Sequence, residues 1–227
     1  RNLLYLTSQA HLVGFYYKPR VDKELLAKHA KGLVALSACG SGEVPRLLLN
    51  GNPQGARQAA SWYRDLFGAG RFFLEIQEHD LPEMVSVNRE LVAMSREMNL
   101  PLVATNDVHF VDERDAPAQE ILLCIQTNAT LDDPKHMRLS GNGYHMRTQE
   151  EMSALFRETP EALTNTRLVV DQCDLKLDFN RLHLPEYAVP EGHTPDTYLA
   201  ELCQEGLHRR YHPVTHQAEE RLRYELD

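Results

Sequence analysis

The sequence predicts an α/β protein in which a parallel sheet is followed by a mostly helical segment. Apolar runs at residues 33–37, 72–76 and 102–105 have the length of short strands and lack the alternation of half-exposed strands. Such runs are typical of strands that are buried on both faces. Stretches with helical periodicity separate them, and strands that alternate with helices indicate a parallel sheet with crossover connections.

Periodicity and end signals predict the helices of the first half. The expected helices cover residues 22–29, 54–66, 82–98 and 115–125. Lys31-Gly32 is a stop signal for the first of them. The methionines of the third recur at helical spacing, so we interpret them as core residues rather than as a cofactor site.

The second half has a different texture. Residues 126–147 are rich in Thr, Asn, Asp, Pro and Gly, which indicates a connector. Thr148 with Glu151 three residues later forms a capping box and predicts a helix start. Further helices are expected over residues 160–173, 195–211 and at the end of the chain. The predicted division is therefore residues 1–125, 126–147 and 148–227.

Composition narrows the class of protein. The chain has 227 residues, 42% of them hydrophobic and 25% charged, as is ordinary for a globular protein. Its net charge of −9 gives no overall basic surface for nucleic acid, although an acidic module of a larger DNA-handling protein stays open. The absence of a signal peptide, of a membrane-length apolar run and of a CxxC pair favours reduced thiols in the cytoplasm. Because it starts at Arg1 and stops within a helical pattern, we interpret the chain as a piece of something longer.

The first candidate site residues follow the third predicted strand. Asp107 and His109 are two positions apart, so in an extended chain they point to the same side. A carboxylate beside an imidazole suits a divalent metal ion, and parallel α/β folds place their chemistry at this end of the strands. The alternative is a plain turn, because Asn-Asp is a common strand terminator.

The other two strands also carry candidate residues near their ends, namely Cys39, Glu75 and His79. Ends of parallel strands converge, and zinc or manganese binds mixed sulfur, oxygen and nitrogen ligands, activates water and holds phosphate oxygens. Alternatively, Cys39 is a small buried residue, Glu75 forms a salt bridge and His79 is solvated. No GxSxG, P-loop or GxGxxG motif is present. Nine histidines show no ligand spacing and are treated as surface residues: His11, His29, His136, His145, His183, His193, His208, His212 and His216.

Several separated segments, taken together and in order, resemble the alpha subunit family of bacterial DNA polymerase III. The resemblance runs nearly end to end. The segments that carry it are residues 10–20, 31–39, 72–77, 103–110, 131–134, 160–166 and 202–211.

The resemblance implies a fold and a set of ligands. Residues 1–125 would be the C-terminal portion of a polymerase-and-histidinol-phosphatase (PHP) domain, a distorted seven-stranded βα barrel with a metal cluster at its strand ends. Residues 148–227 would be the helical start of the polymerase region. Carried over by position, Cys39, Asp107 and His109 match metal ligands, whereas Glu75 and His79 match a motif near the site. The family's remaining ligands, including a His-x-His pair, would lie before Arg1. Some members have lost the ligands, and retention of these three argues that the metals are kept.

The resemblance also implies a function for the parent protein. It would be a DNA-directed DNA polymerase, a nucleotidyltransferase of DNA replication, with magnesium at a polymerase site beyond Asp227. The PHP portion would use zinc or manganese for phosphoester hydrolysis, as in 3′–5′ exonuclease proofreading. Implied partners are DNA template–primer, deoxynucleotides, the sliding clamp, other replisome subunits and a separate proofreading exonuclease, with no membrane.

Three alternatives stay open. The first is a free-standing phosphatase, against which the helical extension speaks. The second is a non-catalytic scaffold that docks a separate exonuclease. The third is the error-prone paralogue of the polymerase.

Overall fold

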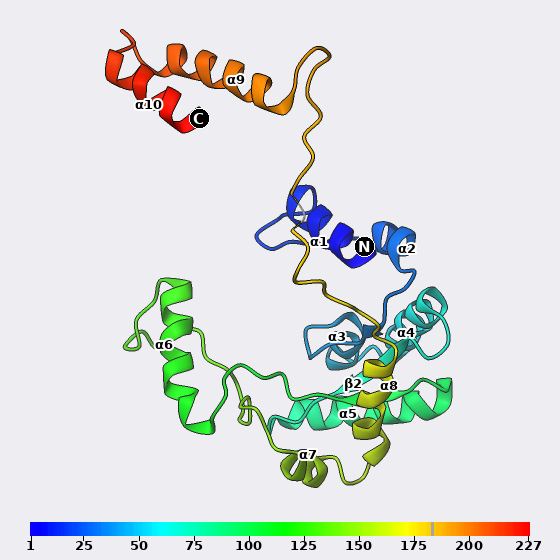
Figure 1. Ribbon diagram of the computed structural model, residues 1–227. Helices are drawn as coiled ribbons and strands as arrows, with labels where there is room; N and C mark the ends of the chain where they lie inside the picture. Colours follow the sequence, from blue (N-terminus) through cyan, green and yellow to red (C-terminus); the bar gives the residue numbers. More distant parts are fainter. Residues whose placement is uncertain (183) are drawn as a thin grey trace. The chain divides into compact units, whose positions relative to one another are not determined.

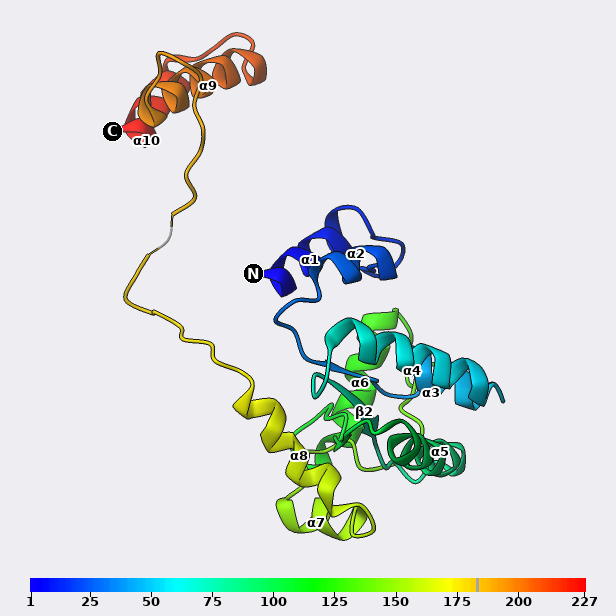
Figure 2. The same ribbon diagram turned by 90° about the vertical axis from the view of Figure 1, so that its right-hand side faces the viewer.

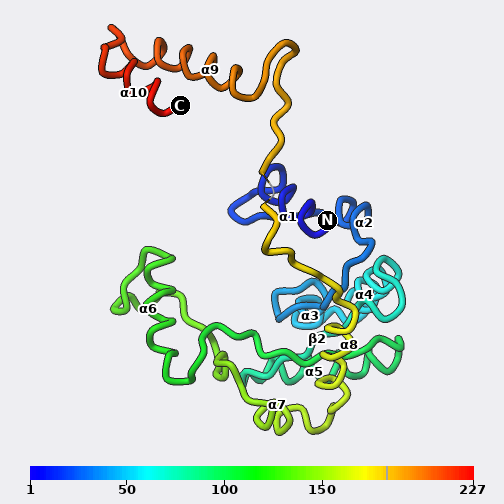
Figure 3. Tube along the Cα trace, in the orientation of Figure 1, coloured from blue at the N-terminus to red at the C-terminus, as the bar shows by residue number. Residues whose placement is uncertain are grey.

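The computed structural model describes residues 1–182 and 184–227, which fall into two compact units, Arg1–Asp174 and Leu175–Asp227 (Figures 1 and 3). The expectation made for His183 lies outside the described residues. Compactness is a different criterion from family boundaries, so the division at residues 125 and 147 stays a prediction.

The first unit has mixed α/β structure with a small parallel sheet. Its helices are α1 (Asn2–Leu12), α2 (Lys23–His29), α3 (Glu43–Leu49), α4 (Pro53–Phe67), α5 (Pro82–Met98), α6 (Ala116–Thr127), α7 (Gln149–Leu155) and α8 (Pro160–Asp171), with a 3₁₀ turn η1 (Glu113–Asp115). Its strands are β1 (Ala35–Leu36), β2 (Phe72–Ile76) and β3 (Leu102–Ala104).

The sheet confirms the predicted parallel pairing. The strand order is β1-β2-β3, so β2 pairs on both of its edges. Ala35 lies opposite Phe72 in the first pair, and Leu74 lies opposite Leu102 in the second. Every residue of β2 and β3 is buried, as the apolar runs predict. The same expectation is wrong for the run at residues 33–37, because β1 has only two residues and Leu36 is 38% exposed. The strands are short, and all three end at the same edge of the sheet because they run in parallel.

Helices α4, α5 and α8 surround β2 and β3 and bury the core with them (Figures 1 and 2). Leu91 and Met94 of α5 are fully buried in this core. Ala162 of α8 joins the same core, and the Asn165 side-chain amide donates to the Leu102 carbonyl oxygen at 2.8 Å. Helix α8, which follows the predicted connector, therefore packs on the sheet.

The predicted helix boundaries have identifiable caps. The Asp22 carboxylate accepts the Leu25 N–H at the start of α2, and the Asn52 side chain accepts the Gly55 N–H at the start of α4. Thr148 and Glu151 form the predicted capping box at the start of α7.

Two helices were not predicted from the sequence. Helix α1 packs against α2, and α3 packs against α4 and α5. Pro45 lies in the first turn of α3, where a missing N–H costs no helical hydrogen bond.

The second unit contains helices α9 (Pro195–Arg210) and α10 (His216–Leu226), which pack against each other. Thr194 and Thr215 cap their N-termini. Among the described residues, no helix is long and apolar enough to cross a lipid bilayer.

We predict that Leu91→Ala lowers the free energy of unfolding by about 2–5 kcal/mol, because it opens a cavity beside β2. Leu122→Ala on α6 is the matched control, since Leu122 is 58% exposed and its truncation should change stability by less than about 0.5 kcal/mol. Urea unfolding of both variants measures the difference. Equal losses would contradict the assigned core.

Candidate functional site at the ends of the strands

The side chain of Glu75 joins the ends of all three strands. It lies near the end of β2, and its Oε2 accepts the Ala38 backbone N–H at 3.1 Å. Its Oε1 accepts the Thr105 hydroxyl and, at 3.2 Å, the Gln77 side-chain amide. That amide also donates to Thr105 Oγ1 at 2.9 Å. Both carboxylate oxygens are therefore engaged within the protein, in a network that links the residues after β1 and β3.

Asp107 and His109 lie side by side after β3. Asp107 Oδ1 is 3.6 Å from His109 Nε2, and both side chains are more than one-third exposed. We expected the two side chains to point to the same side because the chain would be extended. That reason is wrong, because the φ of Asp107 is 45°, in the left-handed region. A turn at Asp107, rather than a strand-like alternation, brings the pair together.

Cys39 follows a similar turn after β1, where Ala38 has a φ of 64°. Asp107 and Cys39 both act on the ionisation of Tyr144. Burial raises the pKa of Tyr144, and the charges of Asp107 and Cys39 raise it further. Among the described residues, however, Cys39, Asp107 and His109 do not form a group that is placed to hold a metal ion.

Tyr144 also contacts both histidines of the candidate set. Its ring stacks on His79 with centroids 4.1 Å apart and meets His109 edge-on at 5.5 Å. The Tyr144 hydroxyl donates to the Ser140 carbonyl oxygen at 2.6 Å. The expectation that His79 is solvated is wrong, because only 3% of it is exposed.

The buried ring of His79 has one satisfied nitrogen. Its Nδ1 lies 3.1 Å from the Asn142 carbonyl oxygen, whereas its Nε2 is buried and has no hydrogen-bond partner among the described residues. Burial lowers the pKa of His79, which favours the neutral imidazole.

Residues 141–147 form a strap over the strand ends that the sequence pattern did not reveal. The strap runs beside residues 109–111: the His109 N–H donates to the Tyr144 carbonyl oxygen at 2.8 Å. The Asn142 N–H donates to the His79 carbonyl oxygen at 3.0 Å. A stretch that reads as connector is therefore part of the site.

The types of donor side chain suit zinc or manganese, but the number of donors that lie together is too small for a metal site. Among the described residues, no group of three or more His, Cys, Asp and Glu side chains is placed to hold a metal ion. Asp107 and His109 form a pair only, and Glu75 is occupied by hydrogen bonds. The described residues thus do not fit a complete metal site by themselves.

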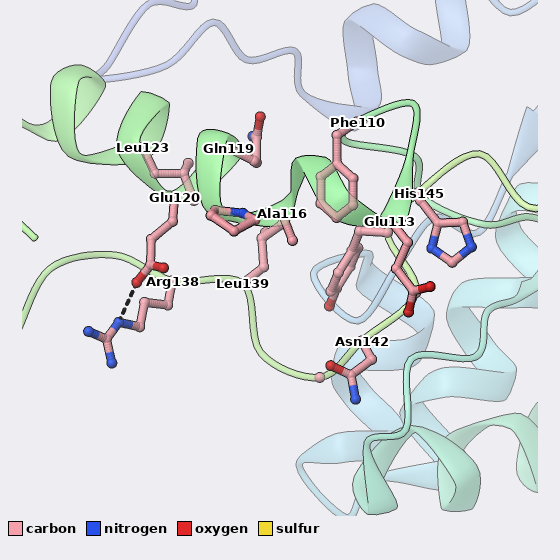
Figure 4. A pocket seen from close by; sticks show the side chains of 14 residues that line it. Phe110, Glu113, Ala116, Gln119, Glu120, Leu123, Arg138, Leu139, Asn142 and His145 are labelled. Atoms are coloured by element: carbon pink, nitrogen blue, oxygen red, sulfur yellow. Dashed lines mark ion pairs between the residues drawn. The ribbon is translucent and has the colours of Figure 1, made fainter.

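A cavity of about 420 Å³ borders the strap (Figure 4). Phe110, which follows His109, and Tyr144 contribute aromatic walls, and Asn142 and His145 contribute polar groups. Figure 4 shows the ion pair between Glu120 and Arg138 on the α6 side of this cavity.

Beside this ion pair lies His136, whose side chain is fully buried. The expectation that His136 is a surface residue is therefore wrong. Its Nε2 is 2.7 Å from Glu120 Oε1 and its Nδ1 is 2.6 Å from the Asp133 carbonyl oxygen. The hydrogen bond to Glu120, followed by that to Asp133, raises the pKa of His136, and the same bond lowers the pKa of Glu120.

Part of the chain matches a known domain family. Residues 1–79 match the family model of the PHP domain. This match covers the turn at Cys39 together with Glu75 and His79, and Asp107 and His109 lie outside it.

The likeness to individual proteins extends over the whole chain. It is 42% identical over 228 residues to the DNA polymerase III subunit alpha of Borreliella burgdorferi, and this alignment covers 100% of the chain and 20% of the relative. The subunit from Treponema pallidum is 40% identical, with 100% of the chain and 20% of the relative aligned. The subunit from Thermus aquaticus is 42% identical, with 93% of the chain and 18% of the relative aligned. The chain belongs to the DNA polymerase III alpha subunit family and spans about one fifth of the length of these relatives.

We predict that Gly141→Ala loosens the strap. Gly141 has a φ of 81°, and a Cβ there would lie 2.0 Å from the His79 carbonyl oxygen. Gly68→Ala is the matched control, since its φ is 86° and its Cβ would meet nothing within 4 Å. Both should lose about 1 kcal/mol to backbone strain, and only Gly141→Ala should lose at least about 1 kcal/mol more. Equal losses in urea unfolding would contradict the contact.

We also predict a pH dependence at His136. Because its pKa is raised in the folded state, the stability it contributes is fully present below the unfolded value of about 6.5 and is lost as the pH rises through the folded pKa. Glu120→Gln should bring the pKa of His136 back toward its ordinary value and reduce this loss. An NMR titration of the imidazole measures the effect, and identical titrations would refute it.

Proposed function

We propose that the chain forms part of the catalytic alpha subunit of a bacterial replicative DNA polymerase. The observation that carries this proposal is the identity of about 40% along the full chain to proteins of that name. The parent protein would add deoxynucleotides to a primer on a DNA template. The magnesium site for that reaction would lie outside these residues, as would the basic surface that a chain of net charge −9 does not supply.

The proposed architecture completes the observed sheet. Strands β1, β2 and β3 would be part of a distorted seven-stranded βα barrel within residues 1–125. Residues 126–147 would connect it to the helical start of the polymerase region, residues 148–227. The PHP match over residues 1–79 and the parallel strand order support this proposal.

We further propose that Cys39, Asp107 and His109 contribute ligands to a zinc or manganese site whose other donors lie outside this chain. The Asp107–His109 pair supports it, as does the turn that carries Cys39 after β1 at the same edge of the parallel sheet. A divalent ion there would supply the chemistry of phosphoester hydrolysis, which suits 3′–5′ proofreading. The cavity is lined by Phe110, which follows His109 in the chain, and by Tyr144, whose ring meets His109 edge-on. Its aromatic walls offer a surface against which the end of a DNA strand could lie.

The partners follow from the same proposal. They would be DNA template–primer, deoxynucleotides, the sliding clamp and other replisome subunits. The place of action would be the cytoplasm, where bacterial DNA is replicated.

A second candidate is a non-catalytic role in which the domain braces the polymerase and docks a separate proofreading exonuclease. This role needs no further metal donors, and among the described residues no group of three His, Cys, Asp or Glu side chains is placed to hold an ion. A free-standing phosphatase is less well supported, because the identity to the polymerase subunits continues through α9 and α10.

We predict that Asp107→Asn in the full-length subunit lowers bound zinc or manganese and reduces 3′–5′ exonuclease activity by at least about tenfold, because a metal ligand is lost. Elemental analysis and hydrolysis of a labelled primer measure the two effects. Asp65→Asn, an exposed carboxylate on α4, is the control. Polymerase activity should persist in both.

Unchanged metal and unchanged nuclease activity in Asp107→Asn would contradict the metal proposal. A metal-free wild-type subunit would favour the scaffold.

A further inference from the structure

We propose that Glu75 is a positioning residue that fixes the turn at residues 38–39 relative to the turn at residues 105–109. This inference rests on the proposed function only in that those turns carry the proposed ligands. Glu75 would not bind the metal itself, because both of its oxygens accept hydrogen bonds from the protein.

The position of Glu75 on the central strand makes this possible. Because β2 lies between β1 and β3, one side chain near its end reaches both neighbours. Its Oε2 binds the Ala38 N–H after β1, and its Oε1 binds the Thr105 hydroxyl after β3. A second tie strengthens the first side, since the Glu75 N–H donates to Ser37 Oγ at 2.8 Å.

The tied atoms are close in sequence to the proposed ligands. Ala38 directly precedes Cys39, and Thr105 lies two residues before Asp107. Ala38 and Asp107 both adopt left-handed backbone conformations, which cost free energy in non-glycine residues and persist only when surrounding contacts hold them. The hydrogen bond to the Ala38 N–H is a contact of this kind.

The chemistry requires a carboxylate at this position. Glu75 is 9% exposed, and a buried carboxylate is costly unless donors satisfy it. Three donors converge on it: a backbone N–H, a hydroxyl and an amide. A glutamine would fill the same volume, but its NH₂ group would replace one acceptor and face one of the donors. Hydrogen bonds to a charged acceptor are also stronger than those to a neutral one.

The test is amide hydrogen exchange by NMR on the 227-residue chain. In Glu75→Gln we expect the Ala38 amide to exchange at least about tenfold faster, while the Leu91 amide in the core helix α5 keeps its rate. We also expect the amide signals of Asp107 and His109 to shift. An unchanged Ala38 rate would overturn the proposal.

A milder pair of variants tests the coupling across β2, also in case Glu75→Gln fails to fold. Thr105→Val removes one donor with little change in shape, and Thr105→Ser keeps the hydroxyl. We expect Thr105→Val to move the signals of Ala38 and Cys39, on the far side of β2, and Thr105→Ser to leave them in place. A shift confined to β3 would mean that Thr105 is merely structural there, and it would refute the tie.

Ser95→Ala is the matched control, since it removes a part-buried hydrogen bond to the Leu100 carbonyl oxygen at the opposite end of β3. It should leave the Ala38 signal unchanged. A separate measurement in the full-length subunit is Mn²⁺ affinity, which Glu75→Gln should weaken about 10–100-fold. If the wild-type subunit binds no Mn²⁺, the proposed function fails, whereas the exchange data still decide the role of Glu75.

Discussion

The pairing of β2 with parallel strands on both of its edges is the constraint on which the first unit depends. Because every residue of β2 is buried, helices must cover it, and α4, α5 and α8 supply that cover. Because all three strands run in the same direction, the turns that follow them emerge at one edge of the sheet. The same pairing thus fixes both the position of the core and that of the candidate site.

At that edge of the sheet, the hydrophobic core is followed by a polar network in which most of the described groups have hydrogen-bond partners. The carboxylate of Glu75 has its donors, and Tyr144 has its carbonyl acceptor. Among the described residues near this edge, the buried Nε2 of His79, Oδ1 of Asn106 and Nδ1 of His145 have no hydrogen-bond partner, while Asp107 and His109 face each other at 3.6 Å. Groups that the fold has positioned but not satisfied are candidates for function. The strap at residues 141–147 holds the backbone of this region, so the site depends on chain segments far apart in the sequence.

Local patterns were sufficient for most of the helices and strands. The apolar runs predicted β2 and β3, and the capping box at Thr148 predicted α7, because these signals lie within a few residues. Helix α1 escaped prediction because its apolar residues form no single stripe. The contacts of Tyr144 with His79 and of His136 with Glu120 join residues 65 and 16 positions apart, which no local pattern reports. The turn at Asp107 was likewise hidden, since an Asn-Asp pair does not specify the sign of φ.

The central claim is that the turns after β1 and β3 bring Cys39, Asp107 and His109 to one ion. The most direct measurement is an anomalous difference map from crystals of the full-length subunit soaked in Mn²⁺ or Zn²⁺. The account predicts a peak within coordinating distance, about 2.0–2.3 Å, of the Asp107 and His109 side chains, with Cys39 in the same cluster. A map with no peak at this edge of the sheet, or with its peaks only elsewhere, would contradict it.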